Sequence, residues 1–181
     1  RIGELRRRIQ SKPALRHWYE ECYVRYEDCL EHCPEEGLAV ELGAGGSFVQ
    51  DSIPGIVTSD LLPYLGVDRS VDAMAMPFED QSVRALLMQN VFHHLPDVSA
   101  FLDEARRVLK PGGRILMIEP HPGWVATPLW KYLHHENFDP AAASWKFESD
   151  GPLTDANGAL AWIVFERDRP VFEKHFPELE I

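Results

Sequence analysis

A short apolar run that ends in a cluster of glycines constrains the fold of this chain most strongly. Residues 38–42, Leu-Ala-Val-Glu-Leu, have the composition of a buried strand, and Gly43-Ala44-Gly45-Gly46 follows directly. Glycine adopts backbone conformations that a side chain would forbid, and it lets the backbone approach a ligand closely. We therefore predict a strand that ends in a tight turn open to a ligand.

Further apolar runs alternate with helical patterns along the chain. They predict strands at 56–60, near 67–72, at 85–90 and at 114–119. Asp97 opens a helix with apolar residues at 101, 102, 105, 108 and 109, and the segment 110–113, Lys-Pro-Gly-Gly, ends it. This alternation predicts a Rossmann-like α/β fold, an open and mostly parallel sheet with helices on both faces. Only about six residues separate Asp60 from the third strand, too few for the usual crossover helix.

Length and charge narrow the class of protein. The 181 residues predict a single domain, with a helical segment at 1–36, a ligand-binding core at 37–120 and a further segment at 121–181. A formal charge of −11 argues against binding duplex nucleic acid, which normally requires a basic face. The longest apolar runs fall short of the ~20 residues that span a bilayer, and no signal peptide is evident. We expect a cytoplasmic protein without a transmembrane segment; the sequence leaves its oligomeric state open.

Three cysteines, Cys22, Cys29 and Cys33, lie within twelve positions. A secreted disulfide scaffold would spread an even number along the chain, so we expect a reducing compartment. Together with Leu15, Trp18 and Tyr26 they form one apolar stripe at helical spacing, which predicts that they pack in the core. A zinc site of Cys29, His32 and Cys33 is the less favoured interpretation.

Acidic residues at the ends of the first three strands indicate the kind of ligand. Glu41, two residues before Gly43, suits an ammonium group and would repel a pyrophosphate. Phe48 stands where the dinucleotide fingerprint needs a glycine, which disfavours nicotinamide or flavin cofactors. Asp60 is placed to accept hydrogen bonds from the hydroxyl groups of a ribose. Asp72 could accept a hydrogen bond from the amino group of an adenine. A ligand with all three parts is S-adenosylmethionine (SAM).

With these residues the sequence resembles the class I SAM-dependent methyltransferases, particularly the small-molecule enzymes typified by quinone-biosynthesis methyltransferases. The resemblance runs from about 38 to 120 and is carried by five segments in order, 41–45, Asp60, 72–78, 90–95 and 109–114. It implies the strand order 3-2-1-4-5. It also implies a sixth and a seventh strand, and the sequence ends at Ile181, about where the sixth would begin, so we expect that this chain is a fragment.

The resemblance also assigns roles to individual residues. It implies that Glu41 and the backbone of Gly43, Ala44 and Gly45 hold the methionine part of SAM, with Gln89 at its amino group. Asp60 would bind the ribose. The adenine would be bound by Asp72 with the backbone of Ala73 and Met74.

A small-molecule acceptor is expected near the carboxyl ends of the fourth and fifth strands, where sheets of this kind bind ligands. His93, His94, Glu119 and His121 are candidate general bases there, and we favour His94 and His121. We expect no metal, because adjacent histidines such as those in His134-His135-Glu136 face different directions on a helix. The three tryptophans beyond the fifth strand would either line the acceptor pocket or cover the sheet. They are Trp124, Trp130 and Trp145.

Two other functions remain open. One is a nucleotide-dependent oxidoreductase or epimerase on the same fold. The other is a non-catalytic partner subunit that keeps the methyltransferase fold without its site.

Overall fold

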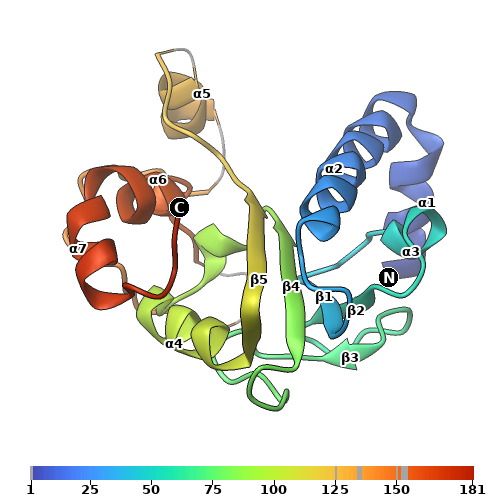
Figure 1. Ribbon diagram of the computed structural model, residues 1–181. Helices are drawn as coiled ribbons and strands as arrows, with labels where there is room; N and C mark the ends of the chain where they lie inside the picture. The colour runs from blue at the N-terminus through green and yellow to red at the C-terminus, as the bar shows by residue number, and fades with distance from the viewer. Residues whose placement is uncertain (1, 125, 134–135, 150, 152–154) are drawn as a thin grey trace.

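The computed structural model describes residues 2–124, 126–133, 136–149, 151 and 155–181. Its centre is a five-stranded sheet whose neighbouring strands all run parallel, in the order β3-β2-β1-β4-β5 (Figure 1). The strands are β1 (Leu38–Leu42), β2 (Val57–Asp60), β3 (Arg69–Ser70), β4 (Val83–Gln89) and β5 (Leu109–Ile118). The predicted α/β fold and its strand order are confirmed.

Helices cover both faces of this sheet (Figure 1). One face carries α1 (Ile2–Ser11), α2 (Pro13–Glu31) and α3 (Val49–Ser52). The other carries α4 (Val98–Val108), α6 (Leu160–Trp162), the π-helical turn η2 (Ile163–Arg167) and α7 (Arg169–His175). The 3-10 turn η1 (Phe92–His94) follows β4, and α5 (Ala126–Leu133) follows β5. None of the helices in the described ranges has both the length and the apolar character needed to cross a membrane.

The alternation of side chains along β1 divides the interior into two clusters. Val40 and Leu42 point into a large apolar cluster beneath α4. Ala39 points to the opposite face, where Tyr23 and Tyr26 of α2 pack on it. Glu41 shares this second face by the same alternation, so a carboxyl group is placed among tyrosines rather than among aliphatic side chains.

The helix α4 begins as predicted, because the Asp97 carboxylate accepts a hydrogen bond from the Ala100 amide at 3.1 Å. The start of β5 differs from the prediction. The strand begins at Leu109 rather than at Arg114, and the register shifts between these two residues, so the segment 110–113 bulges from the ladder instead of preceding it. Gly113 permits this bulge, because a Cβ atom there would lie 2.9 Å from the carbonyl oxygen of Lys110.

The link between β2 and β3 contains a turn in place of a crossover helix, as its length predicts. Asp68 fixes the turn: its carboxylate accepts hydrogen bonds from the backbone amide and the hydroxyl of Thr58, at 2.8 and 2.9 Å. Burial acts to raise the pKa of Asp68, but these bonds and one from Gln50 outweigh it, so the pKa is lowered. β3 is accordingly only two residues long.

The apolar stripe of α2 is covered over only part of its length. Cys22 is buried, and Cys29 and Cys33 are half-buried against the cluster beneath α2, whereas Leu15 and Trp18 are 40% and 50% exposed. Trp18 lines a pocket together with Met117 and Ile118 at the end of β5, so this part of α2 lies beside the sheet without being packed closely on it. The predicted core position of the cysteines is therefore correct, whereas Leu15 and Trp18 of the same stripe are exposed.

Candidate cofactor site

The glycine turn after β1 is packed tightly against the loop that follows β4. Gly43 and Gly45 have φ angles of +65° and +49°, in the left-handed region that favours glycine. A Cβ atom on Gly43 would lie 2.5 Å from Cγ2 of Val91. The amide of Ala44 donates to the carbonyl oxygen of Ser59 at 2.8 Å, which anchors the turn to β2.

Asp60, the acid expected to bind a ribose, lies beside this turn. Its Oδ2 atom accepts a hydrogen bond from the Gly45 amide at 3.0 Å, and its Oδ1 atom accepts one from the Leu62 amide at 3.3 Å. The carboxylate therefore links the end of β2 to the end of β1. The structure brings together two of the predicted site elements that are separated in the sequence.

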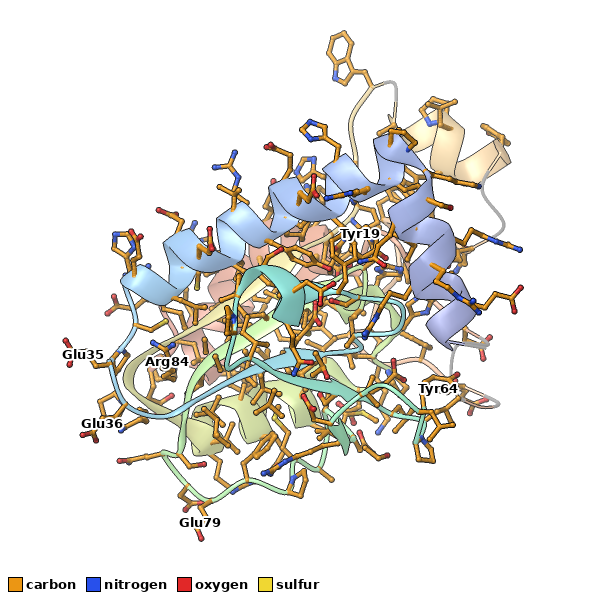
Figure 2. The ribbon with its side chains drawn as sticks, turned by 90° about the vertical axis from the view of Figure 1, so that its right-hand side faces the viewer. Tyr19, Glu35, Glu36, Tyr64, Glu79 and Arg84 are labelled. Carbon is orange, nitrogen blue, oxygen red and sulfur yellow. The ribbon has the colours of Figure 1, made fainter. Side chains whose placement is uncertain are left out.

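Glu41 is buried beneath α2, and Tyr19 projects from that helix toward the same region (Figure 2). Its Oε1 atom accepts from the Ser47 hydroxyl at 3.0 Å, and Oε2 has no hydrogen-bond partner. The Ser47 hydroxyl lies 3.0 Å from the hydroxyl of Tyr23. Because Ser47 donates its single hydroxyl proton to Glu41, Tyr23 donates to Ser47, and the Tyr23 oxygen accepts from the Phe48 amide. Burial raises the pKa of Glu41 to about 8, although the Ser47 bond and the charge of Arg6 act in the opposite direction.

Gln89 supplies a second buried acceptor at the same end of the sheet. Its Oε1 atom is buried without a hydrogen-bond partner. Leu87 pairs with Glu41, so Gln89, two residues further along β4, points to the same face of the sheet as Glu41. A buried polar atom without a hydrogen-bond partner is unfavourable, and two such atoms lie at this end of the sheet.

The segment expected at the adenine is fixed by its own hydrogen bonds. The Asp72 Oδ1 atom accepts from the Met74 amide at 2.8 Å, and the Asp72 carbonyl accepts from the Ala75 amide at 3.0 Å. Ala73 and Met74 are half-buried and pack against the cluster beneath α4. The preceding residue, Val71, donates its amide to the carbonyl of Asp60 at 2.9 Å, which connects this segment to β2.

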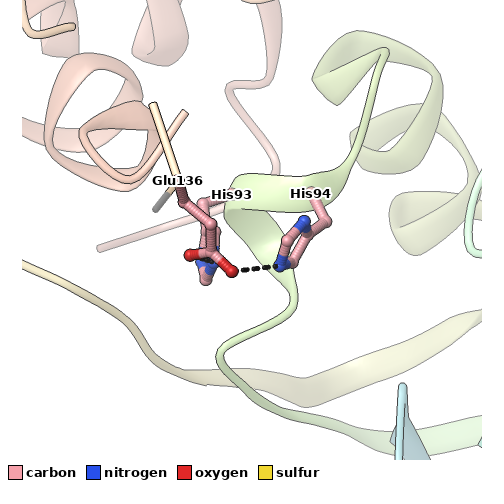
Figure 3. Close-up of side chains that lie close together, drawn as sticks. All are labelled: His93, His94 and Glu136. Carbon is pink, nitrogen blue, oxygen red and sulfur yellow. Dashed lines mark ion pairs between the residues drawn. The ribbon is translucent and has the colours of Figure 1, made fainter. Parts of the chain in front are cut away.

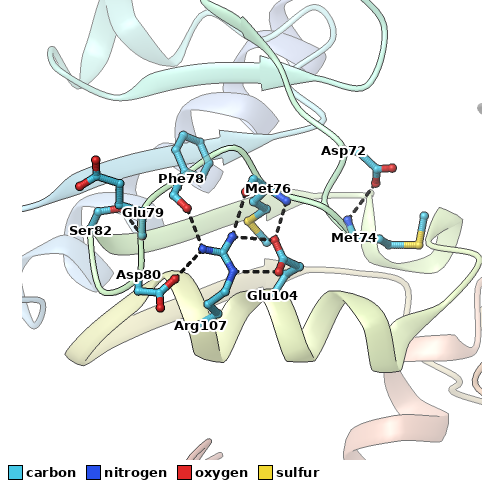
Figure 4. A network of polar contacts seen from close by, with 9 residues as sticks. All are labelled: Asp72, Met74, Met76, Phe78, Glu79, Asp80, Ser82, Glu104 and Arg107. Atoms are coloured by element: carbon cyan, nitrogen blue, oxygen red, sulfur yellow. Dashed lines mark hydrogen bonds and ion pairs between the residues drawn. The ribbon is translucent and has the colours of Figure 1, made fainter.

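Two residues of α4, which the sequence analysis did not single out, hold the continuation of this segment (Figure 4). The Arg107 guanidinium donates to the carbonyl oxygens of Met76 and Phe78 at 2.9 and 2.7 Å. Glu104 accepts from the Met76 amide at 2.7 Å and from Arg107 at 2.8 Å. Asp80 is paired with the same guanidinium at 2.8 Å.

Replacing Arg107 with methionine is expected to loosen the segment 72–82 while α4 stays folded, since methionine keeps the length and helix propensity of arginine but loses every donor. Hydrogen exchange should become faster at the amides from Met74 to Ser82. Arg106→Met is the matched control, because Arg106 pairs only with exposed Asp103 among the ion pairs described for it. The expectation fails if the amides of this segment exchange at the same rate in both variants.

A group of histidines and carboxylates lies beyond the end of β4 (Figure 3). His93 is buried, and its Nδ1 atom is 2.5 Å from Oε2 of Glu119. The other oxygen of Glu119 accepts from the amides of Val91 and Phe92, each at 2.8 Å. The Nε2 atoms of His93 and His94 lie 3.5 and 3.6 Å from the two oxygens of Glu136. Nothing in the sequence spacing predicts that Glu136 lies beside His93 and His94.

The two favoured bases are in different environments. His94 is half-buried and lines a cleft of about 610 Å³, together with Asn137, Asp139 and Asn157. His121 is exposed, and its Nε2 atom is 2.8 Å from Glu166. His134 and His135, which the sequence analysis considered as metal ligands, lie outside the described residues.

The three tryptophans beyond β5 do not share one pocket lining. Trp124 is 99% exposed. Trp130 stacks on Phe138, and the indole nitrogen of Trp145 donates to Asp168 at 2.9 Å. Trp130 and Trp145 therefore cover a small apolar cluster.

Several known proteins with similar sequences are methyltransferases. A family model described as a methyltransferase domain matches residues 58–117. A demethylmenaquinone methyltransferase of Tropheryma whipplei is 36% identical over 84 residues, which are 41% of this chain and 35% of that protein. The ubiquinone/menaquinone biosynthesis C-methyltransferase UbiE of Bartonella tribocorum is 46% identical over 117 residues, 60% of this chain and 44% of that protein.

Over the central part of the chain, the sequence is therefore similar to methyltransferase domains. It matches less than half of the length of these two relatives. Among solved structures, a methyltransferase in complex with the Haloferax volcanii Trm112 methyltransferase activator is similar at a TM-score of 0.50 and 23% identity, over 71% of this chain and 62% of that one. The PH0226 protein of Pyrococcus horikoshii is similar at 0.50 and 20%, over 68% and 62%. These two likenesses confirm the fold of the methyltransferase domain.

Proposed function

We propose that this methyltransferase domain binds SAM and transfers its methyl group to a small-molecule acceptor. The observation that carries the proposal is the pair of buried acceptors without a donor, Oε2 of Glu41 and Oε1 of Gln89, on one face of the sheet beside the glycine turn. The amino group of a methionine part is a donor of the required charge. Asp60, at the end of the neighbouring strand β2, is placed to bind the ribose.

Each residue has a task that follows from its place. Glu41 and Gln89 would accept from the amino group, and the backbone of Gly43, Ala44 and Gly45 would pass beside the methionine part. Asp60 would accept from the ribose hydroxyls. Asp72, Ala73 and Met74 would form the adenine side. Bound SAM supplies a methyl group on a sulfonium, and the protein contributes alignment and exclusion of water, which provide up to ~7–11 kcal/mol in ideal cases.

The two other functions are less well supported. A dinucleotide-binding turn needs close helix packing at a glycine, whereas Phe48 is buried there, stacked on Tyr19 with ring centroids 5.7 Å apart. A partner subunit without a site would have no reason to keep two unpaired buried acceptors, which are unfavourable in the absence of a ligand.

The acceptor side completes the proposal. His94 is better placed than His121 to act as a general base, since it lines the cleft beyond β4 and His121 is exposed in an ion pair.

The proposal keeps the division of the chain into a helical segment (1–36), a cofactor-binding core (37–120) and an acceptor-side segment (121–181) of one domain. A nucleic-acid acceptor is not proposed, given the charge of −11. A cytoplasmic location belongs to the same proposal and is supported by three free cysteines.

Calorimetric titration with S-adenosylhomocysteine, the product form of the cofactor, tests the proposal, with NADH as a parallel titration. Micromolar binding of the first ligand alone is expected. Asp60→Ala should weaken that binding at least tenfold, about 1.4 kcal/mol. Cys29→Ala should leave it unchanged, because Cys29 packs at the far end of α2.

Thermal melts of both variants show whether each is folded. Binding of NADH in place of S-adenosylhomocysteine would reject the proposed function. Equal loss of binding in the two folded variants would reject the assignment of Asp60.

A further inference from the structure

The atoms of three side chains beyond β4 converge in a way that the cofactor site does not use. One ring nitrogen each of His93 and His94 and a carboxylate oxygen of Glu136 all lie within 4.8 Å of one another (Figure 3). His93 and His94 come from η1, and Glu136 comes from the segment after α5. The packing of the chain, rather than sequence spacing, therefore assembles the group.

The hydrogen bonds of the two rings fix which nitrogen carries the proton. Nδ1 of His93 faces the Glu119 carboxylate, and Nδ1 of His94 is 3.2 Å from the carbonyl oxygen of Asp155. A carboxylate and a carbonyl oxygen both accept, so in each neutral ring the proton is on Nδ1. In this neutral form both Nε2 atoms present a lone pair toward the same carboxylate, and a proton on a ring or a metal ion between the three groups removes the repulsion.

The separations fit a shared metal ion better than direct hydrogen bonds. The distances of 3.5 and 3.6 Å from the Nε2 atoms to Glu136 exceed the 2.7–3.2 Å that is usual for such bonds. Ligand atoms at about 2.0–2.2 Å from a tetrahedral zinc ion are about 3.4 Å apart. We propose that His93, His94 and Glu136 bind one divalent transition-metal ion, with zinc as the representative case.

The surroundings of His93 support this proposal independently. A histidine that binds a metal through one nitrogen usually donates from the other to a carboxylate, which fixes the tautomer and the ring. Glu119 does this for His93 and is itself held by two backbone amides. His93 is only 2% exposed, so the ring is fixed before any ion arrives.

The same geometry leaves the ion accessible. Three protein ligands leave at least one position open, as in catalytic rather than structural zinc sites. His94 and Glu136 line the 610 Å³ cleft beyond β4, so the open position faces that cleft. An oxygen atom of an acceptor would be the chemical class of ligand that completes the site. In the metal-bound state His94 does not serve as a base, and the ion would acidify a bound hydroxyl in its place.

This inference departs from the prediction of no metal. That prediction weighed the run 134–136 and the cysteines, and neither interpretation joined Glu136 to His93 and His94. Within the described part of the chain, His32 bonds through Nδ1 to the Asp28 carbonyl and the Cys33 thiol donates to the Cys29 carbonyl, so the cysteine region forms no comparable group.

Titration of the chelator-treated chain with Zn²⁺, and with Co²⁺ as a spectroscopic probe, tests the proposal without SAM. One equivalent is expected, with a Co²⁺ spectrum that lacks the intense thiolate charge-transfer band. His94→Ala and Glu136→Gln should each weaken binding at least tenfold. Glu119→Gln, which does not touch the ion, should weaken it by about 10–100-fold.

Matched controls separate this site from adventitious binding. His175→Ala removes an exposed histidine of α7, and the double change Cys29→Ser with Cys33→Ser removes the two neighbouring thiols. Both should leave the affinity unchanged. The proposal is overturned if no ion binds, if binding follows the thiols, or if His94→Ala binds as tightly as the unchanged chain.

The metal site stands on geometry and not on the proposed function, and the two are tested apart. S-adenosylhomocysteine titration in the presence of a chelator examines the cofactor site alone. Metal titration without that ligand examines His93, His94 and Glu136 alone. Failure of either one leaves the result of the other interpretable.

Discussion

Gly43→Ala is expected to lower the free energy of unfolding by about 2–5 kcal/mol. Left-handed backbone accounts for about 1–2 kcal/mol of this, because the φ angle of +65° is unfavourable for alanine. The remaining ~1–3 kcal/mol comes from overpacking, since the added Cβ atom would lie 2.5 Å from Cγ2 of Val91. Urea denaturation followed by far-ultraviolet circular dichroism measures the change.

Gly45→Ala is the matched control within the same turn. Its φ angle of +49° is also left-handed, but the nearest atom to an added Cβ is the Gly43 carbonyl oxygen at 3.8 Å. It should therefore lose only the backbone contribution of about 1–2 kcal/mol. Adding Val91→Ala to Gly43→Ala should recover part of the loss by making room for the methyl group. Equal destabilisation by the two glycine variants would contradict the close approach of the turn to Val91.

Glu41→Gln is expected to stabilise the chain in alkaline solution. Burial raises the pKa of Glu41 to about 8 from an ordinary value of 4.5. Between these two pH values the folded state holds a proton that the unfolded chain has released, so stability falls as the pH rises through this window. Glutamine does not titrate, and its advantage should grow from pH 5 to pH 9, reaching on the order of 3–5 kcal/mol.

The same variant should lose affinity for S-adenosylhomocysteine, because glutamine removes the negative charge proposed to face the amino group. Chemical denaturation at several pH values and calorimetric titration at pH 8 measure the two effects. Glu36→Gln is the control for stability, since Glu36 is almost fully exposed (Figure 2) and its substitution should change neither quantity. A stability difference that does not vary with pH would refute the buried position of the Glu41 carboxyl group.

Local patterns in the sequence were sufficient for the features that depend on local structure. The composition of residues 38–42 placed β1, and the capping carboxylate of Asp97 placed the start of α4. The pattern of residues 56–60 placed Asp60 at the end of β2, and its hydrogen bond to the Gly45 amide is a finding of the structure. The roles assigned to these residues in binding SAM remain predictions.

Features that depend on distant packing were not predictable in this way. Glu136 meets His93 and His94 only because the segment after α5 returns to η1, and nothing in its neighbouring residues indicates that path. Arg107 has the position of an ordinary helix-surface arginine, yet it bonds to backbone near β4. The start of β5 was misplaced because Lys-Pro-Gly-Gly is a typical helix stop, whereas here it bulges within a strand.

The division of β1 between two clusters has a consequence for how this domain tolerates changes in length. Inserting or deleting one residue in β1 would exchange its two faces, placing Glu41 beneath α4 and Val40 among the tyrosines of α2. A change of length in the link between β2 and β3 does not exchange a buried face with another, because β3 is only two exposed residues long. Among homologues, insertions and deletions should therefore accumulate in that link and be absent from β1.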